Sequence, residues 1–132
     1  MHLILELVPN HSSDQHEWFM ESRLSKDSPF SDYYIWADGD NGEPPNNWIS
    51  MYGGSAWTYM SARNQWYLHT FSENEPDLNY RNPMVEKEMT VSMNTVSISV
   101  RPTLISVKIL CYKIPWWKRL SCRLPISYSA SK

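Results

Sequence analysis

A chain of 132 residues with a formal net charge of −2 has the length of one ordinary domain. Its apolar runs fall short of the roughly 18 residues of a membrane-spanning helix, so we expect no membrane span. The two cysteines, Cys111 and Cys122, lack the C-x-x-C spacing of zinc sites, which argues against a zinc centre.

The charges are unevenly distributed along the chain. All 14 acidic residues lie in residues 1–89 together with five basic ones, whereas residues 90–132 carry seven basic residues and no acidic one. Such a break indicates two stretches with different histories. We therefore place a boundary near residue 90.

The first predicted element is a buried strand over residues 3–8. Its sequence is an apolar run with a single acid, and Pro9 ends it because proline has no N–H to give to a sheet. Asn10, His11 and Ser12 follow at once. Folds with parallel strands place their chemistry just past strand ends, so this stretch is the first candidate site.

Two further elements follow from local patterns. Ser12 and Gln15 have the spacing of a capping box, which predicts a helix from about residue 14 to residue 24. Residues 56–60 and 65–69 are rich in aromatic residues and are predicted to be strands, and 61–64 can join them as a hairpin loop. A short aromatic strand is also predicted at 33–36.

A second helix should begin at Asn82 and Pro83, because asparagine is a good N-cap and proline suits the first helical position. Residues 90–100 are rich in β-branched residues and serine, which are weak helix formers. We therefore expect the helix to end near residue 90. The tail, 91–132, is expected to be loosely placed or extended, because its alternating apolar residues have no core to pack on.

Five ordered blocks of this sequence closely resemble the α-amylase superfamily, in particular its maltase-type α-glucosidases and oligo-1,6-glucosidases. The resemblance covers about residues 2–89. The blocks are LELVPNHSS at 5–13, DYYIW at 32–36, PPNNW at 44–48, GGSAW at 53–57 and EPDLNYRNP at 75–83.

The resemblance implies an α/β fold, a fragment of a (β/α)8 TIM barrel with the inserted domain B and its small antiparallel sheet. A complete barrel needs about 250 residues, so only a part fits here. By this resemblance residues 1–11 are barrel strand 3 and its end, 12–82 are domain B, and 83–90 start barrel helix 3. Residues 91–132 are a divergent basic tail.

For the full-length parent, the resemblance implies hydrolysis of terminal α-glucosidic bonds of maltose or sucrose-like sugars with retention. The partner is then an oligosaccharide, with no nucleic acid and no required cofactor. The family's nucleophile motif, a Gly-Phe-Arg-Ile-Asp-like stretch, is absent downstream, as are its acid/base and third-acid segments. Glu6, Asp14 and Asp77 match no catalytic motif. We assign no catalytic residue and expect this chain alone to be inactive.

His11 matches the histidine that, in the family, hydrogen-bonds the glucose at the cleavage point. An imidazole donates from one nitrogen and accepts at the other, which suits a sugar hydroxyl. The alternative is a histidine held in a local turn. By the same resemblance Asn10 and Asp77 stand at calcium-ligand positions, where oxygen donors suit a hard cation. Since glucosidases often lack that ion, hydrogen bonds that anchor the loop are the favoured alternative.

Two positions depart from the family pattern. Glu6 stands where aspartate is usual and Glu75 where glutamine is usual, which puts local geometry or the preference between α-1,6 and α-1,4 bonds in question.

Four aromatic residues could stack on sugars, although strand spacing favours a role in the core of the small sheet. They are Trp48, Trp57, Trp66 and Tyr67. Two other function classes stay open: an ectodomain fragment of a non-catalytic amino-acid transporter heavy chain, and a small sugar-binding or interaction module.

Overall fold

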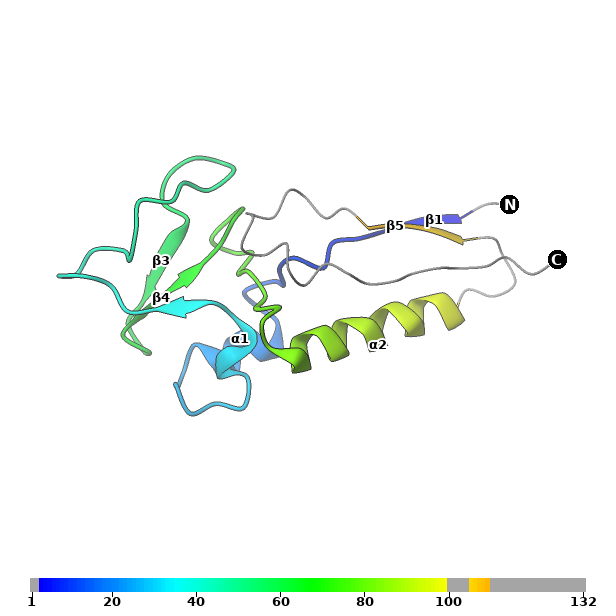
Figure 1. Ribbon diagram of the computed structural model, residues 1–132, viewed down its shortest axis with the longest axis horizontal. Coiled ribbons are helices and arrows are strands. Elements are labelled where there is room, and N and C mark those ends of the chain that lie inside the picture. Colours follow the sequence, from blue (N-terminus) through cyan, green and yellow to red (C-terminus); the bar gives the residue numbers. More distant parts are fainter. Residues whose placement is uncertain (1–2, 100–104, 110–132) are drawn as a thin grey trace.

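The computed structural model describes residues 3–99 and 105–109 (Figure 1). Its elements fall into a small unit around a three-stranded sheet and a longer part made of two strands and a helix (Figure 1). In chain order they are β1 (Leu3–Leu7), α1 (Glu17–Ser22), the 3-10 helix η1 (Ser31–Tyr33), β2 (Trp36–Ala37), β3 (Trp57–Met60), β4 (Gln65–Leu68), α2 (Pro83–Ser99) and β5 (Ile105–Ile109).

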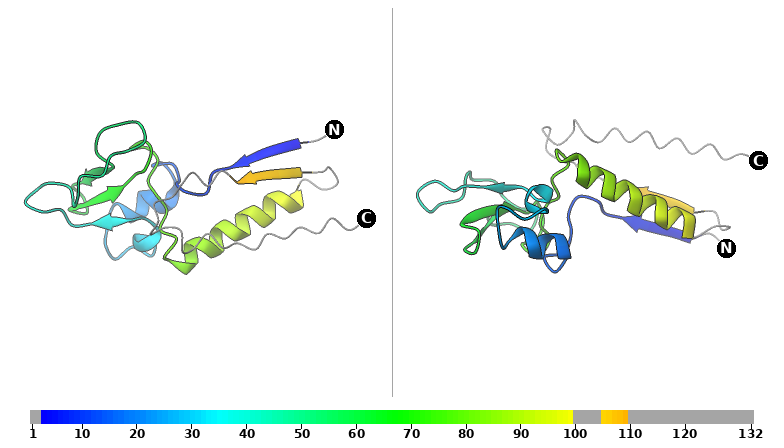
Figure 2. Two further views of the ribbon diagram at one scale, coloured as in Figure 1. Left: turned by 45° about the horizontal axis from the view of Figure 1, so that its top comes forward. Right: turned by 90° about the horizontal axis from the view of Figure 1, so that it is seen from below.

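The longer part is a β–α–β arrangement. Strands β1 and β5 pair in parallel, with Leu3 opposite Ile105 and Leu7 opposite Ile109. Helix α2 lies along this pair in both views of Figure 2. Parallel strands need a crossover connection between them, and here α2 with the small unit provides it.

The second helix is longer than expected, and the part of the tail at residues 105–109 is extended as expected but paired with another strand. Helix α2 begins at Pro83 as predicted, and the Asn82 side chain accepts the backbone N–H of Met84 at 2.9 Å. It then continues through Ser99 rather than ending near residue 90. Residues 105–109 form a strand on β1, which gives their alternating apolar residues a pairing partner. Residues 100–104 and 110–132, with both cysteines, lie outside the described residues.

The small sheet has the strand order β2-β4-β3, and all its pairs are antiparallel. The hairpin prediction is confirmed: β3 and β4 pair from Trp57 opposite Leu68 to Met60 opposite Gln65. Asn64 closes the turn with a φ of +54°, a left-handed conformation that asparagine tolerates better than most residues. The predicted aromatic strand is shorter than expected, because residues 31–33 form the 3-10 helix η1.

The core of the small unit is aromatic. Phe19 of α1 packs edge-on against Tyr34 and Tyr67, with ring centroids 5.0 and 5.1 Å apart. Trp57 and Tyr67 are buried in this unit, which agrees with the core interpretation, whereas Trp48 is 40% exposed. The buried members of the main cluster are Phe19, Tyr33, Tyr34, Tyr67, Leu78 and Val85.

Helix α1 begins later than predicted. Its N-cap is His16, whose side chain accepts the backbone N–H of Trp18, and the helix covers only Glu17–Ser22. The Ser13 hydroxyl instead accepts the N–H of Gln15 at 3.1 Å in a local turn. Short polar side chains compete with helix formation in this way, so the expected capping box at Ser12 does not form.

The side chain of Arg63 connects α1 and η1 to the hairpin of β3 and β4. The Arg63 guanidinium is 7% exposed and donates to the backbone oxygens of Ser22 and Ser25 at 2.7 and 3.0 Å. It also donates to the Ser31 hydroxyl at 2.8 Å and to the Gln65 side chain at 2.7 Å. A residue of the hairpin loop therefore binds three segments of the unit together.

Within residues 3–99 and 105–109, none of the helices combines the length and the apolar character that crossing a membrane requires.

Candidate functional site

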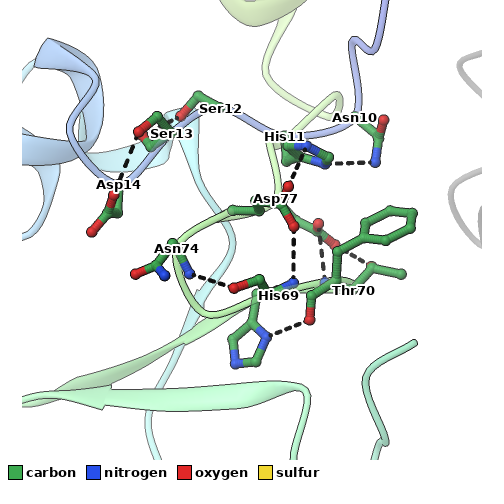
Figure 3. A network of polar contacts seen from close by, with 12 residues as sticks. Asn10, His11, Ser12, Ser13, Asp14, His69, Thr70, Asn74 and Asp77 are labelled. Atoms are coloured by element: carbon green, nitrogen blue, oxygen red, sulfur yellow. Dashed lines mark hydrogen bonds and ion pairs between the residues drawn. The ribbon is translucent and has the colours of Figure 1, made fainter. Parts of the chain in front are cut away.

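The site at the end of β1 is built by two chain segments that run side by side. His11 and Asp77 form an antiparallel bridge. The backbone N–H of Leu78 donates to the Asn10 carbonyl at 3.0 Å, and that of Ser12 donates to the Pro76 carbonyl at 3.2 Å. Figure 3 shows the polar contacts that surround this pairing. The structure therefore brings the three predicted site residues, Asn10, His11 and Asp77, into one place.

The His11 ring is held on three sides. The Asn10 amide nitrogen lies 2.9 Å from Nδ1, and a Glu75 carboxylate oxygen lies 3.5 Å from Nε2. The Phe71 ring centroid is 5.3 Å from the imidazole centroid. Because an amide nitrogen only donates, Nδ1 accepts, and the neutral ring carries its hydrogen on Nε2. The histidine side chain keeps 17% of its surface exposed, enough to contact a ligand.

Asp77 is completely buried. One of its carboxylate oxygens accepts the backbone N–H of Thr70 at 3.1 Å, and the other accepts the Thr70 hydroxyl in a short contact. The Asp77 backbone N–H donates to the Leu68 carbonyl at 3.0 Å. Hydrogen bonds to an ionised carboxylate are among the stronger ones in proteins. Asp77 therefore fixes the loop that leaves β4.

The donor set was tested against the calcium expectation. The Asn10 Oδ1 atom is buried and has no hydrogen-bond partner in the described part of the chain. Both Asp77 oxygens are already bound to Thr70, and the described residues contain no group of three or more His, Cys, Asp or Glu that could hold a metal ion. A calcium ion takes about six to eight oxygens. The unpartnered Asn10 oxygen would suit a calcium ligand, whereas the Asp77 oxygens are engaged by Thr70, so the described side chains supply only part of the ligand set that calcium needs.

Three residues of this site had no assigned role in the sequence prediction. Thr70, Phe71 and Glu75 all lie on the segment between β4 and Asp77, and each contacts His11 or Asp77. The only feature of the sequence that could have pointed to these residues is their position just after the predicted strand at 65–69. Glu75 was noted only as a departure from the family pattern.

The buried Tyr34 side chain holds the segment that follows His11. The Tyr34 hydroxyl and the Ser12 hydroxyl lie 2.7 Å apart. Burial raises the pKa of Tyr34 to about 12, while the bond to Ser12 opposes the shift, so the phenol stays protonated at neutral pH. Residue 12 is therefore anchored to the aromatic core directly after His11.

Comparison with known proteins shows which family has this sequence. The family model described as the α-amylase catalytic domain matches residues 1–98. The oligo-1,6-glucosidase of Parageobacillus thermoglucosidasius is 55% identical over 87 residues, which are 66% of this chain and 16% of that enzyme. The α-glucosidase of Culex pipiens is 55% identical over 89 residues, 67% of this chain and 15% of that enzyme. The chain thus spans 15% to 16% of these relatives.

Solved structures agree with the sequence match. A mutant isomaltulose synthase from Erwinia rhapontici NX5, in complex with sucrose, superposes with a TM-score of 0.76 at 38% identity, over 82% of this chain and 19% of that one. A mutant trehalulose synthase gives 0.74 at 42% identity, over 81% and 19%. The fold class is therefore that of the TIM barrel, and the chain belongs to the α-amylase catalytic-domain family.

Proposed function

We propose that this chain is part of an α-glucosidase that hydrolyses terminal α-glucosidic bonds of maltose or sucrose-like sugars with retention. In this proposal β1 is barrel strand 3, residues 12–82 are domain B, and α2 is barrel helix 3. The observation that carries it is the position of His11, a clamped, partly exposed imidazole at the end of β1. The enzyme names of the relatives favour this function over a transporter heavy chain.

In this role the Nε2–H of His11, which faces a Glu75 carboxylate oxygen 3.5 Å away, is shared with a hydroxyl of the glucose at the cleavage point. Asn10 holds Nδ1 as the acceptor and so keeps the neutral ring in the tautomer that donates from Nε2. Such a bond accelerates the reaction only as far as it strengthens in the transition state. Phe71 packs on the same ring and limits its rotation.

A chimera makes the proposal testable. The 87 residues of this chain that match the Parageobacillus oligo-1,6-glucosidase, at 55% identity, would replace their counterparts in that enzyme. In that chimera His11→Ala is expected to lower kcat/KM roughly 30- to 160-fold. This corresponds to a loss of about 2–3 kcal/mol of transition-state stabilisation, the scale of one lost hydrogen bond. The measurement is steady-state hydrolysis of isomaltose and maltose.

The matched control is His16→Ala in the same chimera. His16 is exposed and caps α1, so its loss should lower the melting temperature slightly without changing kcat/KM. Equal activity of the His11→Ala variant and the unchanged chimera would refute the assigned role. An inactive parent chimera is a different result, because it would count against the glucosidase proposal as a whole.

The 132-residue chain alone is expected to hydrolyse no glucoside. A retaining glycosidase needs two carboxyl groups about 5 Å apart on a rigid scaffold. Asp77 has both oxygens engaged by Thr70, and Asp14 binds the neighbouring Gln15 side chain at 3.0 Å. The test is purified chain with p-nitrophenyl α-glucoside and with maltose, beside a full-length relative. Glucose release that co-purifies with the chain through two different columns would contradict this expectation.

We infer further that no cofactor is required and that Asn10 and Asp77 anchor the loop through hydrogen bonds. The contacts to Thr70 and His11 support this role over calcium binding.

A further inference from the structure

A second hollow lies at the other end of the small sheet. Its volume is about 580 Å³, within the ~300–1,000 Å³ of small-molecule sites. Strand β4 starts beside it at Gln65 and leads away from it towards His69 and the His11 site. In Figure 1 the loop after β2 extends to the side of the molecule opposite β1. The lining residues are Asp38, Gly39, Gly42, Tyr59, Asn64 and Trp66.

The floor of the hollow is aromatic. Tyr59 and Trp66 are cross-strand partners, and their ring centroids lie 5.3 Å apart at an interplanar angle of 57°. Tyr59 is 46% exposed. A Cβ atom at Gly39 would lie 2.4 Å from the Trp66 indole nitrogen, so the backbone of the loop closes tightly on this ring. The two rings therefore form a fixed, angled surface that the apolar C–H face of a sugar ring can pack on.

Polar groups stand beside these rings. The Asp38 carboxylate accepts from Gln65 at 2.9 Å and lies 3.5 Å from the Lys26 ammonium. These two neighbours lower the pKa of Asp38, Gln65 the more strongly, so it is ionised at neutral pH. Asn64 accepts the Tyr59 hydroxyl at 2.6 Å through Oδ1, which leaves its Nδ2 hydrogens for a ligand. A carboxylate and an amide together can accept from and donate to neighbouring hydroxyl groups.

We propose that this hollow is a second carbohydrate site, distinct from the His11 site. A pyranose ring of an oligosaccharide packs on Tyr59 and Trp66, and its hydroxyls bond to Asp38 and Asn64. An apolar ligand would make no use of the Asp38 carboxylate and the Asn64 amide, and a simple cation would make no use of the aromatic floor. The inference goes beyond the proposed glucosidase function, because it requires neither a closed barrel nor turnover.

Two exposed tyrosines offer a matched pair for the test. Tyr59 lies in the hollow, whereas Tyr52 is 75% exposed and lies near the His11 site, with its ring 6.2 Å from Phe71. Binding of maltotriose to the 132-residue chain is followed by NMR up to about 50 mM, since single-ring sites bind in the millimolar range. Tyr59→Ser is expected to weaken binding by at least about tenfold, and Tyr52→Ser by less than about twofold.

Asp38→Asn provides a second variant that leaves the aromatic floor in place, and its expected effect is about fivefold weaker binding. The unchanged chain gives a readout independent of any variant, because the Trp66 indole N–H signal should shift with maltotriose and not with mannitol, which has no ring. An unmoved Trp66 signal would overturn the proposal. So would loss of binding in Tyr52→Ser with full binding in Tyr59→Ser, because the sugar would then lie near His11.

Discussion

Replacing Asp77 with alanine is expected to lower the free energy of unfolding of the 132-residue chain by about 3 kcal/mol. Asp77 is fully buried, and its carboxylate accepts both the backbone N–H and the hydroxyl of Thr70. The truncation leaves both donors in the interior without that acceptor and opens a small void. Urea unfolding, followed by tryptophan fluorescence, measures the change.

Thr70→Val is the control for this prediction. It removes the hydroxyl and keeps the shape and the backbone N–H, so it should cost about 1 kcal/mol, clearly less than Asp77→Ala. EDTA followed by excess calcium should leave the midpoint of the unchanged chain where it was, because hydrogen bonds hold this loop in our proposal. A calcium-dependent rise that Asp77→Ala abolishes would restore the calcium assignment. Equal midpoints for all three chains would remove the anchoring role.

The second large effect is expected at Arg63. Arg63→Met should lower the free energy of unfolding by about 3 kcal/mol, because three acceptors lose this donor and two of them belong to the buried residues Ser22 and Ser31. The acceptors are the carbonyls of Ser22 and Ser25 and the Ser31 hydroxyl. The guanidinium also lies 4.5 Å from the Trp36 ring centroid. Burial lowers the pKa of Arg63 while nearby Asp32 opposes the shift, and the group stays charged at neutral pH.

Lys26→Met makes the same change of charge at the surface. The Lys26 ammonium lies 3.5 Å from Asp38, and both side chains are more than half exposed, so its removal should cost less than about 1 kcal/mol. Arg63→Lys should recover little of the loss, since an ammonium lacks the planar fork that reaches three segments. Similar unfolding curves for Arg63→Met and Lys26→Met would mean that the buried contacts contribute nothing beyond charge.

Local signals explain which parts could be predicted from the sequence. The hairpin follows from aromatic strand-forming residues on both sides of a polar loop, and Asn82 with Pro83 fixes the start of α2 within one turn. His11, Asn10 and Asp77 could be named as candidate site residues because they lie in two of the sequence blocks that resemble the α-amylase superfamily. Each of these signals lies within a few residues of the feature that it predicts.

The missed features depend on contacts between distant residues. Arg63 reads as a polar loop residue, and only the folded chain brings it to Ser22 and Ser31. The continuation of α2 to Ser99 overrules the weak helix preference of residues 90–99, and the pairing of β5 with β1 joins segments that lie far apart in the sequence. Thr70 could not be singled out either, because its hydrogen bonds to the Asp77 carboxylate form only once the loop after β4 has folded back.

The small unit leaves and rejoins the barrel-like part at one point. The N–H of Leu78 binds the Asn10 carbonyl, and the Tyr80 hydroxyl binds the Pro9 carbonyl. Because its two ends are this close, an excursion of any length between them places β1 and α2 in the same relative position. Insertions and deletions within residues 12–76 can therefore accumulate during evolution without disturbing the strand and helix that carry them. Under the proposed glucosidase function, sugar preference can then diversify in the loops of the small unit while β1 and α2 stay unchanged.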